Sequence, residues 1–184
     1  MPNSNMHLLP ANIPLAYFIT LRTYGTWLHG DEKGSVDTRH NHHQTPLAPA
    51  NPSQRITNQN RLHHAPTLLA ADSAQLIEAT IAEVCRHRRW SLHAVHARTN
   101  HVHIVASGNK SPERMMNDFK AWATRRLREH NFVTGTQTVW ADHGSTPYLW
   151  TNAQVLAAIE YVKNWQGGPL QKTWDEVRRD MENE

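Results

Sequence analysis

The chain has 184 residues, with 19 Lys and Arg against 16 Asp and Glu and a formal net charge of +3 when histidine is neutral. This length fits one ordinary domain with a sizeable core and leaves little room for a second. The one cysteine, Cys85, excludes an intramolecular disulfide, and no stretch reads as a membrane span or a secretory signal. We therefore expect a cytoplasmic protein that does not act at a membrane.

The first third of the chain predicts one strand and a long polar connection. Residues 1–13 show no periodicity and are expected to be flexible. The β-branched and aromatic residues between Leu15 and Leu28 predict a strand, with a bulge or bend at Gly25. Residues from about 31 to 66 are rich in His, Asn and Pro, which predicts a loop that is either functional or partly disordered.

The middle of the chain predicts one helix and two strands. Apolar residues at helical spacing predict a helix that Asp72 or Ser73 caps and that continues to about Arg89. Two alternating stretches follow, over 90–98 and 101–107, and each predicts a strand.

The last third predicts a second helix, a strand and a third helix. The Ser-Pro step at 111–112 is a typical helix start, and an apolar stripe follows it. Residues 139–150 predict a strand or a short hairpin. Thr151 or Asn152 can cap the third helix, which the Gly-Gly-Pro run at 167–169 ends.

The predicted element order is β-α-β-β-α-β with an added C-terminal helix. An antiparallel sheet covered by helices is the economical way to bury these apolar stripes, so we expect an α+β sandwich of ferredoxin-like topology. One domain should span residues 14–168, followed by a tail over 169–184.

The most specific chemical signal is His101-Val102-His103. On a strand, both imidazoles stand on one face with their Cα atoms about 7 Å apart. The pair predicts a metal site, against the alternative of two partly exposed strand histidines. Imidazole suits Mn²⁺ or Zn²⁺ more naturally than Mg²⁺, so the histidines alone do not identify the ion.

Positive charge is concentrated around this pair. Between Cys85 and Asn131, ten Lys and Arg accompany only three acidic residues. Such a skew favours a polyanionic partner, although a solvated helix face is the alternative. Tryptophans add possible stacking surfaces for unpaired bases. The candidates for DNA contact are Lys120, Arg125, Arg126, Arg128 and Trp140.

Several segments together resemble the IS200/IS605-like transposases, which belong to the HUH single-tyrosine nucleases. Within that family the closer likeness is to the REP-associated tyrosine transposases. The resemblance covers about residues 15–166. It is carried by Thr-Asn-His-Val-His-Ile-Val at 99–105, Phe-Lys-Ala-Trp-Ala-Thr-Arg-Arg-Leu at 119–127, Trp140, and Ile-Glu-Tyr-Val-Lys-Asn-Trp-Gln at 159–166.

The resemblance implies a metal-dependent transposase-like enzyme that cleaves and rejoins single-stranded DNA near hairpins. Tyr161 would attack a backbone phosphate and leave a 5′-phosphotyrosyl link and a free 3′-hydroxyl. His101 and His103 would hold a divalent metal, Mg²⁺ or Mn²⁺. Members of the family work as homodimers with shared sites or as monomers, and the sequence does not decide between them.

The chain departs from the family pattern at the position of the third metal ligand. The family places Asn or Gln four residues after the tyrosine, but that position here is Trp165. Asn164 would share the helical face of Tyr161, whereas Gln166 needs the helix to loosen before the following glycines. Gln166 is the favoured candidate and Asn164 the alternative.

Other readings of these residues stay open. Tyr17, Tyr24 and Tyr148 are rival nucleophiles, although core or edge packing accounts for them. The chain could be a non-catalytic nucleic-acid-binding protein derived from such a transposase. A third reading is a metallohydrolase that uses the histidine pair together with the His-Asn-His-His cluster at 40–43, because a metal can activate water. A covalent protein–DNA adduct would separate the first function from the other two.

Overall fold

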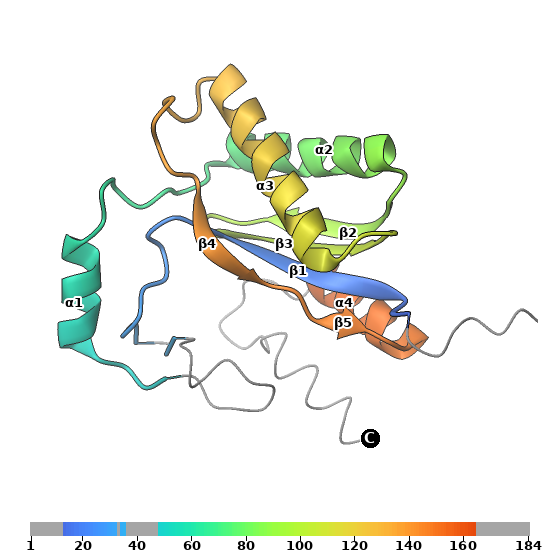
Figure 1. Cartoon of the computed structure of the whole chain (residues 1–184), viewed down its shortest axis with the longest axis horizontal. Coiled ribbons are helices and arrows are strands. Elements are labelled where there is room, and N and C mark those ends of the chain that lie inside the picture. The colour runs from blue at the N-terminus through green and yellow to red at the C-terminus, as the bar shows by residue number, and fades with distance from the viewer. Residues whose placement is uncertain (1–12, 33, 36–47, 165–184) are drawn as a thin grey trace, which may run out of the picture.

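Strand β1 is the centre of one antiparallel sheet, ordered β2-β3-β1-β4, and β5 also pairs with β1 (Figure 1). The computed structural model describes residues 13–32, 34–35 and 48–164. The strands are β1 (Ala16–Thr23), β2 (Ser91–Ala97), β3 (His101–Ser107), β4 (Trp140–Ser145) and β5 (Tyr148–Leu149). The helices are α1 (Pro52–Asn60), α2 (Ala71–Arg88), α3 (Pro112–Glu129) and α4 (Asn152–Asn164).

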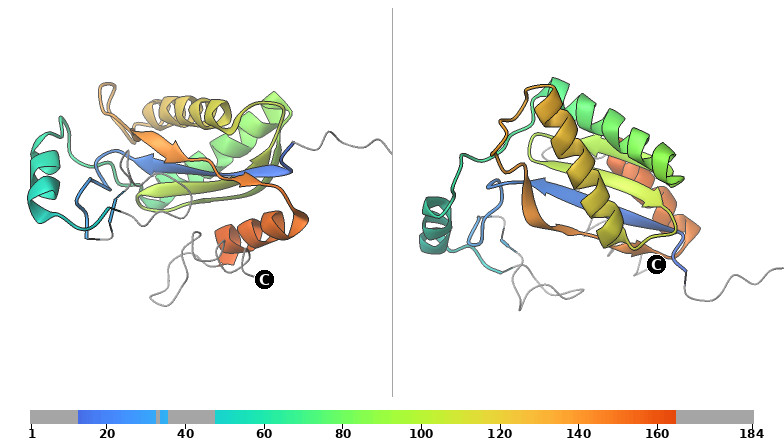
Figure 2. Two further views of the ribbon diagram at one scale, coloured as in Figure 1. Left: turned by 60° about the horizontal axis from the view of Figure 1, so that its bottom comes forward. Right: turned by 45° about the horizontal axis from the view of Figure 1, so that its top comes forward.

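Helices cover both faces of the sheet (Figure 2). α2 and α3 pack together on one face, and α4 packs on the other. Because side chains alternate along a strand, β1 sends Ile19 and Leu21 into the core under α2 and α3 and sends Phe18 toward α4. Burial on both faces explains why β1 and β3 are almost continuously apolar.

The strand order confirms the predicted ferredoxin-like α+β fold. β1 lies between β3 and β4, both antiparallel to it, and α2 and α3 provide the crossovers. The β1–β3 ladder has a register that positions the site described below: Thr20 is opposite His103, and Arg22 is opposite His101.

The first predicted strand and loop differ from the observed structure. β1 ends at Thr23, because Gly25 adopts a positive φ of 72° and turns the chain. The expected loop contains a helix, α1, in which Asn51 caps the first turn by accepting a hydrogen bond from the backbone N–H of Gln54 at 3.0 Å. Residues 1–12, 33 and 36–47, the last including the histidine cluster at 40–43, lie outside the described residues.

The start of α2 also differs from the prediction. The cap residue is Ala70, which makes no side-chain capping bond, so the predicted cap at Asp72 or Ser73 is wrong. Ser73 lies inside the first turn instead, and its hydroxyl donates to the Ala70 carbonyl at 2.8 Å.

Residues 139–150 form no hairpin. β4 and β5 both run antiparallel to β1, so they are two parts of one interrupted edge strand. Between them the Pro147 carbonyl accepts a hydrogen bond from the Phe18 N–H at 2.9 Å. Thr151 caps α4 as one of the two predicted residues, its hydroxyl accepting from the Gln154 N–H at 3.2 Å. Leu156 of α4 is 67% exposed.

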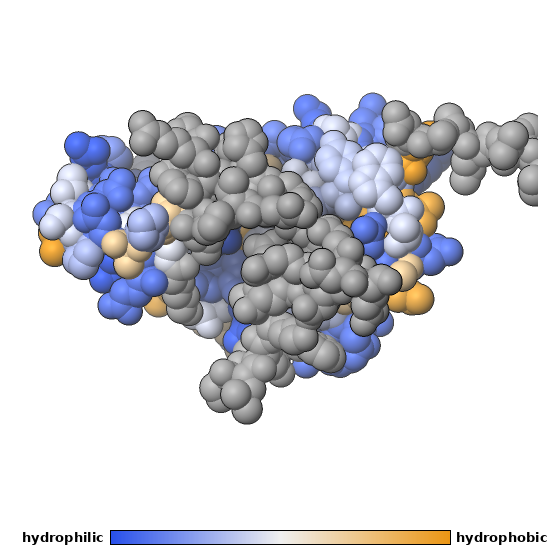
Figure 3. Space-filling view, turned by 90° about the horizontal axis from the view of Figure 1, so that it is seen from below, coloured by the Kyte–Doolittle hydropathy of each residue, from blue (hydrophilic) through white to orange (hydrophobic). Residues whose placement is uncertain are grey.

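The view from below shows a mostly hydrophilic described surface, with apolar side chains exposed at the end where α4 and β5 lie (Figure 3). Tyr148, Trp150 and Leu156 are the large exposed apolar residues of these two elements and their junction. Among the described helices, none has the length and apolar character needed to cross a membrane.

Candidate active site

Two strand histidines lie side by side on the sheet face that α4 covers. His101 and His103 have ring centroids 4.6 Å apart, with the ring planes at 62°. His103 is 8% exposed, whereas His101 is half-buried. The alternation along β3 sends the intervening Val102 into the opposite core, as the sequence predicts.

Each imidazole has an oxygen partner at Nδ1. The Nδ1 of His101 lies 2.7 Å from Oδ1 of Asn100, and since an amide oxygen can only accept, Nδ1 carries the hydrogen. The Nδ1 of His103 lies 2.9 Å from Oγ1 of Thr20. Such partners orient metal-binding histidines, and protonation at Nδ1 leaves Nε2 as the nitrogen with a lone pair.

The charge state of His103 is also suited to ligation. Burial, together with the nearby charges of His101 and Arg22, holds the pKa of His103 well below its ordinary value. The ring is therefore neutral near pH 7, which is the form that binds a metal. Two imidazoles oriented through Nδ1 fit a divalent cation that accepts nitrogen ligands.

Tyr161 of α4 lies beside this pair. Its ring centroid is 5.7 Å from that of His103 and 6.0 Å from that of Phe18, with edge-to-face geometry in both contacts. The helix reaches this position because Ala158 and Val162 pack into the small core on this face. The structure thus brings together the three residues for which the sequence predicts the chemistry.

The rival tyrosines lie elsewhere. Tyr17 belongs to the core under α2 and α3 and contacts the ring of Tyr148 at 5.3 Å. The hydroxyl of Tyr24 accepts a hydrogen bond from the His63 N–H at 3.0 Å. Among the described aromatic contacts, those of the histidine pair involve Phe18 and Tyr161 and none of the three rival tyrosines.

The third ligand stays a prediction. Asn164 is exposed, and its amide donates to Glu160 at 2.8 Å, one turn earlier on α4. Gln166 lies outside the described residues. Within the part of the chain that the structure describes, no three His, Cys, Asp or Glu side chains gather as a metal site.

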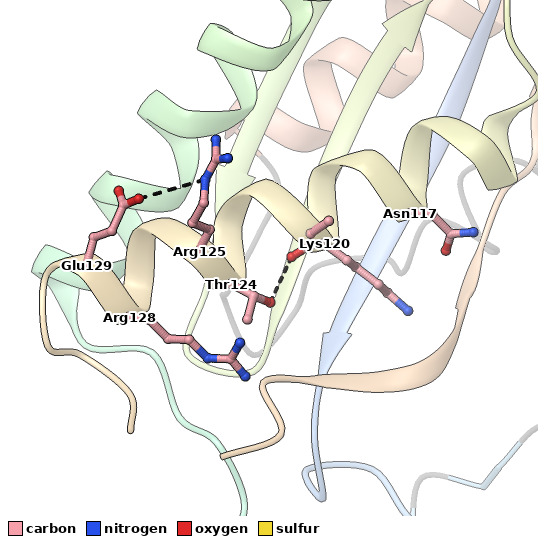
Figure 4. A pocket seen from close by; sticks show the side chains of 7 residues that line it. Asn117, Lys120, Thr124, Arg125, Arg128 and Glu129 are labelled. Atoms are coloured by element: carbon pink, nitrogen blue, oxygen red, sulfur yellow. Dashed lines mark hydrogen bonds and ion pairs between the residues drawn. The ribbon is translucent and has the colours of Figure 1, made fainter. Parts of the chain in front are cut away.

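The basic residues predicted to contact DNA lie on the other side of the sheet. Lys120, Arg125 and Arg128 line an open pocket along the exposed face of α3 (Figure 4). The Lys120 ammonium donates to the carbonyls of Ala141 at 2.7 Å and Asp142 at 3.2 Å, which fastens α3 to β4. Burial lowers the pKa of Lys120.

Arg126 and Trp140 also have structural partners within the chain. Arg126 donates two hydrogen bonds to the carboxylate of Glu83, at 2.7 and 2.9 Å, and thereby joins α3 to α2. Trp140 is 7% exposed in the core, and its indole N–H donates to the Lys120 carbonyl and the Thr124 hydroxyl. This low exposure leaves little of the Trp140 ring for a base to stack on, and its contact with DNA stays a prediction.

Sequence reasoning missed several residues around the pair. Thr20 and Asn100 hold the two imidazoles, although neither belongs to a recognisable motif. His96 on β2 is opposite His103 in register, and its Nδ1 lies 3.4 Å from Oε1 of Glu78. The alternation of side chains along β1 could have identified Thr20 as a partner of His103 only if the register between β1 and β3 were known.

Comparisons with known proteins identify the family of the chain. A family model described as "Transposase IS200 like" matches residues 64–164, more than half of the chain and including both histidines and Tyr161. A solved structure of a REP-associated tyrosine transposase bound to a REP hairpin is similar over 80% of this chain, at 10% identity and a TM-score of 0.42. The chain spans 63% of that protein, and no curated protein matches it. Because this family model matches more than half of the chain, the chain belongs to the IS200-like transposases.

Proposed function

We propose that this protein is a metal-dependent nuclease and strand transferase that acts on single-stranded DNA near hairpins and uses Tyr161 as its nucleophile. The observation that carries the proposal is the 5.7 Å contact between the rings of Tyr161 and His103, beside the oriented imidazole of His101. A nucleophile and a pair of metal-ligating nitrogens then meet at one point on the sheet.

In the proposed step, the Tyr161 oxygen attacks the phosphorus of a DNA phosphodiester. A bond forms between phosphorus and the phenolic oxygen, and the bond from phosphorus to the 3′-oxygen breaks. The phenol loses its proton, and the leaving 3′-oxygen takes one up. One phosphodiester replaces another, so a 3′-hydroxyl can reverse the reaction and rejoin a strand without ATP.

His101 and His103 are the residues that would hold the divalent ion. When bound, Mg²⁺ or Mn²⁺ would polarise a phosphoryl oxygen and reduce the repulsion between the phosphodiester and the incoming phenolate. The protein contributes the ligand orientation through Thr20 and Asn100. The remaining ligands include the predicted Gln166 or Asn164.

The cations along the exposed face of α3 are proposed to hold the DNA backbone outside the reaction centre. Arg125 and Arg128 line the open pocket on this helix. Because backbone contacts carry affinity without base recognition, they should strengthen binding to all sequences alike. The reaction centre and this helix lie on opposite faces of the sheet, so we infer that the DNA extends past a sheet edge.

Tyr161→Phe tests the assignment, because it removes one oxygen and keeps the ring that packs on His103 and Phe18. Wild-type protein incubated with Mn²⁺ and hairpin-bearing single strands should give an adduct that survives a denaturing gel. Digestion should yield a peptide containing Tyr161 with a 5′-phosphate-linked nucleotide. The Phe variant should bind DNA with unchanged affinity and form no adduct.

His103→Ala is the second arm, and it should also abolish the adduct while DNA binding persists. An adduct on Tyr148 or Tyr24 would refute the nucleophile. Cleavage without an adduct would favour a metal-activated water, and DNA binding without cleavage under any metal would favour a non-catalytic binding protein.

A further inference from the structure

Arg22 of β1 lies beside the histidine pair. It is opposite His101 in the β1–β3 ladder, just as Thr20 is opposite His103. Opposite residues of an antiparallel ladder, and residues two apart on one strand, share a face of the sheet. Because the Thr20 hydroxyl reaches Nδ1 of His103, the Arg22 side chain leaves β1 on the face that carries both imidazoles. The register therefore adds a permanently charged guanidinium to the proposed reaction centre.

Trp27 holds this guanidinium in place. Cζ of Arg22 lies over the Trp27 ring, 3.2 Å from its centroid. At that distance the two planes lie face to face, because an edge-on approach would bring a guanidinium nitrogen to the ring first. The N–H groups of a stacked guanidinium point outward in its own plane, so this contact orients the donors without using them.

The ring of Trp27 is itself fixed by the loop that follows β1. Its indole N–H donates to the Gly34 carbonyl at 2.7 Å. The turn that brings the chain back toward Arg22 is closed by the Thr26 hydroxyl, which donates to the Thr23 carbonyl at 2.9 Å. The position of the guanidinium is thus set by folded structure on both sides of it.

The charge of Arg22 is unfavourable for a metal that binds alone. Burial lowers the pKa of His103, and the charges of His101 and Arg22 lower it further, so the guanidinium acts on the proposed ligand. A cation at this position also repels a divalent ion. An anion between the two cations offsets that cost, because both attract it. The combination fits a centre that takes up a metal together with an anion, and the phosphodiester is the anion that the proposed reaction brings.

We propose that Arg22 is a further catalytic residue, whose guanidinium donates hydrogen bonds to a non-bridging oxygen of the phosphodiester that Tyr161 attacks. This inference rests on the proposed function and deepens it. Negative charge on the non-bridging oxygens grows as the phenolic oxygen adds to phosphorus, so oriented donors stabilise the transition state more than the ground state. Arg22 stays protonated throughout, and the bonds that form and break are those of the step described above.

Two substitutions at position 22 separate its charge from its shape. Arg22→Gln keeps part of the aliphatic stem and removes the charge, whereas Arg22→Lys keeps the charge and loses the planar pair of donors. Arg98→Gln is the matched control, because the charge of Arg98 also acts on His103. Thermal melting of each variant reports on the fold.

The decisive measurement compares two DNA strands. Once wild-type protein has defined the cleaved position, a second hairpin-bearing strand is made with a methylphosphonate there, in which a methyl group replaces one non-bridging oxygen and the charge is lost. With Mn²⁺ and DNA saturating, Arg22→Gln should slow adduct formation on the ordinary strand about 100- to 1,000-fold. The rate on the methylphosphonate strand should change little, because that strand has no charge for Arg22 to stabilise. Arg22→Lys should recover part of the rate, and Arg98→Gln should stay close to wild type.

Two further measurements need no chemical step. Calorimetric titration of the free protein with Mn²⁺ should show equal or tighter binding in Arg22→Gln, because a like charge has been removed. In a Tyr161→Phe background, Arg22→Gln should weaken binding of the ordinary strand about tenfold in the presence of Mn²⁺. Binding of the methylphosphonate strand should not change.

Equal slowing on both strands would overturn the inference, because Arg22 would then act through the structure of the site and not on the phosphate charge. Weaker Mn²⁺ binding in Arg22→Gln would overturn it for the same reason. An equal loss in Arg98→Gln would assign the effect to the general positive field around the histidines. Failure of the Arg22 role leaves the wild-type Tyr161 adduct intact, whereas failure of the proposed function leaves no adduct, so the two failures are distinguishable.

Discussion

Oγ1 of Thr20 lies 2.9 Å from Nδ1 of His103, across the β1–β3 ladder and 83 residues away in the chain. This contact orients a buried imidazole that also lies against the ring of Phe18. It makes Thr20 a positioning residue for the proposed metal site.

Thr20→Val should weaken metal binding while preserving the fold. Valine keeps the branched shape of threonine and removes the hydroxyl, so the His103 ring loses its partner. The loss of such an outer partner typically costs about 10- to 100-fold in metal affinity. Titration of the protein with Mn²⁺, followed by calorimetry, measures the effect, and Thr20→Ser should retain most of the affinity. Equal Mn²⁺ affinity in the Val variant and wild type would show that the hydroxyl does not orient the ligand.

The site should be complete within one chain. Tyr161 and His103 contact each other in a single copy, through the packing of α4 on the sheet. A mixture of Tyr161→Phe and His103→Ala proteins should therefore form no DNA adduct, because neither copy has both groups. Wild-type protein diluted with the double variant serves as the positive control. An adduct in the mixture would mean that α4 is exchanged between copies.

Arg126 and Arg128 should behave differently, although they lie close together on α3. Arg126 is bound to Glu83 and lowers the pKa of that carboxyl, whereas Arg128 lines the open pocket. Arg128→Gln should reduce the salt slope of DNA binding by about one, and Arg126→Gln should change it little. The Arg126 variant should instead lose some stability near neutral pH. Because Arg126 lowers the pKa of Glu83 in the folded protein, the difference in stability between wild type and variant should shrink as the pH falls through that pKa.

The opposite result, a larger change in salt slope from Arg126→Gln, would return Arg126 to the predicted DNA contacts. Chemical denaturation at neutral and acid pH supplies the stability readout.

Gly144→Ala should destabilise the sheet next to the site. A Cβ at Gly144 would collide with the carbonyl oxygen of Thr20 and lie 2.6 Å from Sδ of Met116. Because the backbone of Thr20 cannot move aside as a flexible side chain can, we expect the free energy of unfolding to fall by about 1–3 kcal/mol. Gly135→Ala is the control, because nothing lies within 4 Å of its added Cβ. Urea denaturation of the two variants checks the difference, and equal midpoints would contradict it.

The sequence by itself determined the features that depend on local periodicity. Alternation along 101–107 places His101 and His103 on one face of a strand, and the helical spacing of apolar residues identifies α2, α3 and α4. The element order then favours the ferredoxin-like sheet, because few topologies bury those stripes. Local patterns failed at α1, where polar residues form a helix without a buried face.

Only the tertiary structure decided which groups meet. The contact of Tyr161 with His103 depends on α4 packing on the opposite face from α2 and α3, and the Thr20 contact depends on the register of β1 and β3. The packing of α3 on the sheet buries Trp140, and the placement of α3 and α4 on opposite faces separates the basic helix from the histidine pair. Periodicity specifies which side of an element is buried, whereas the partner on that side depends on contacts between residues distant in the chain.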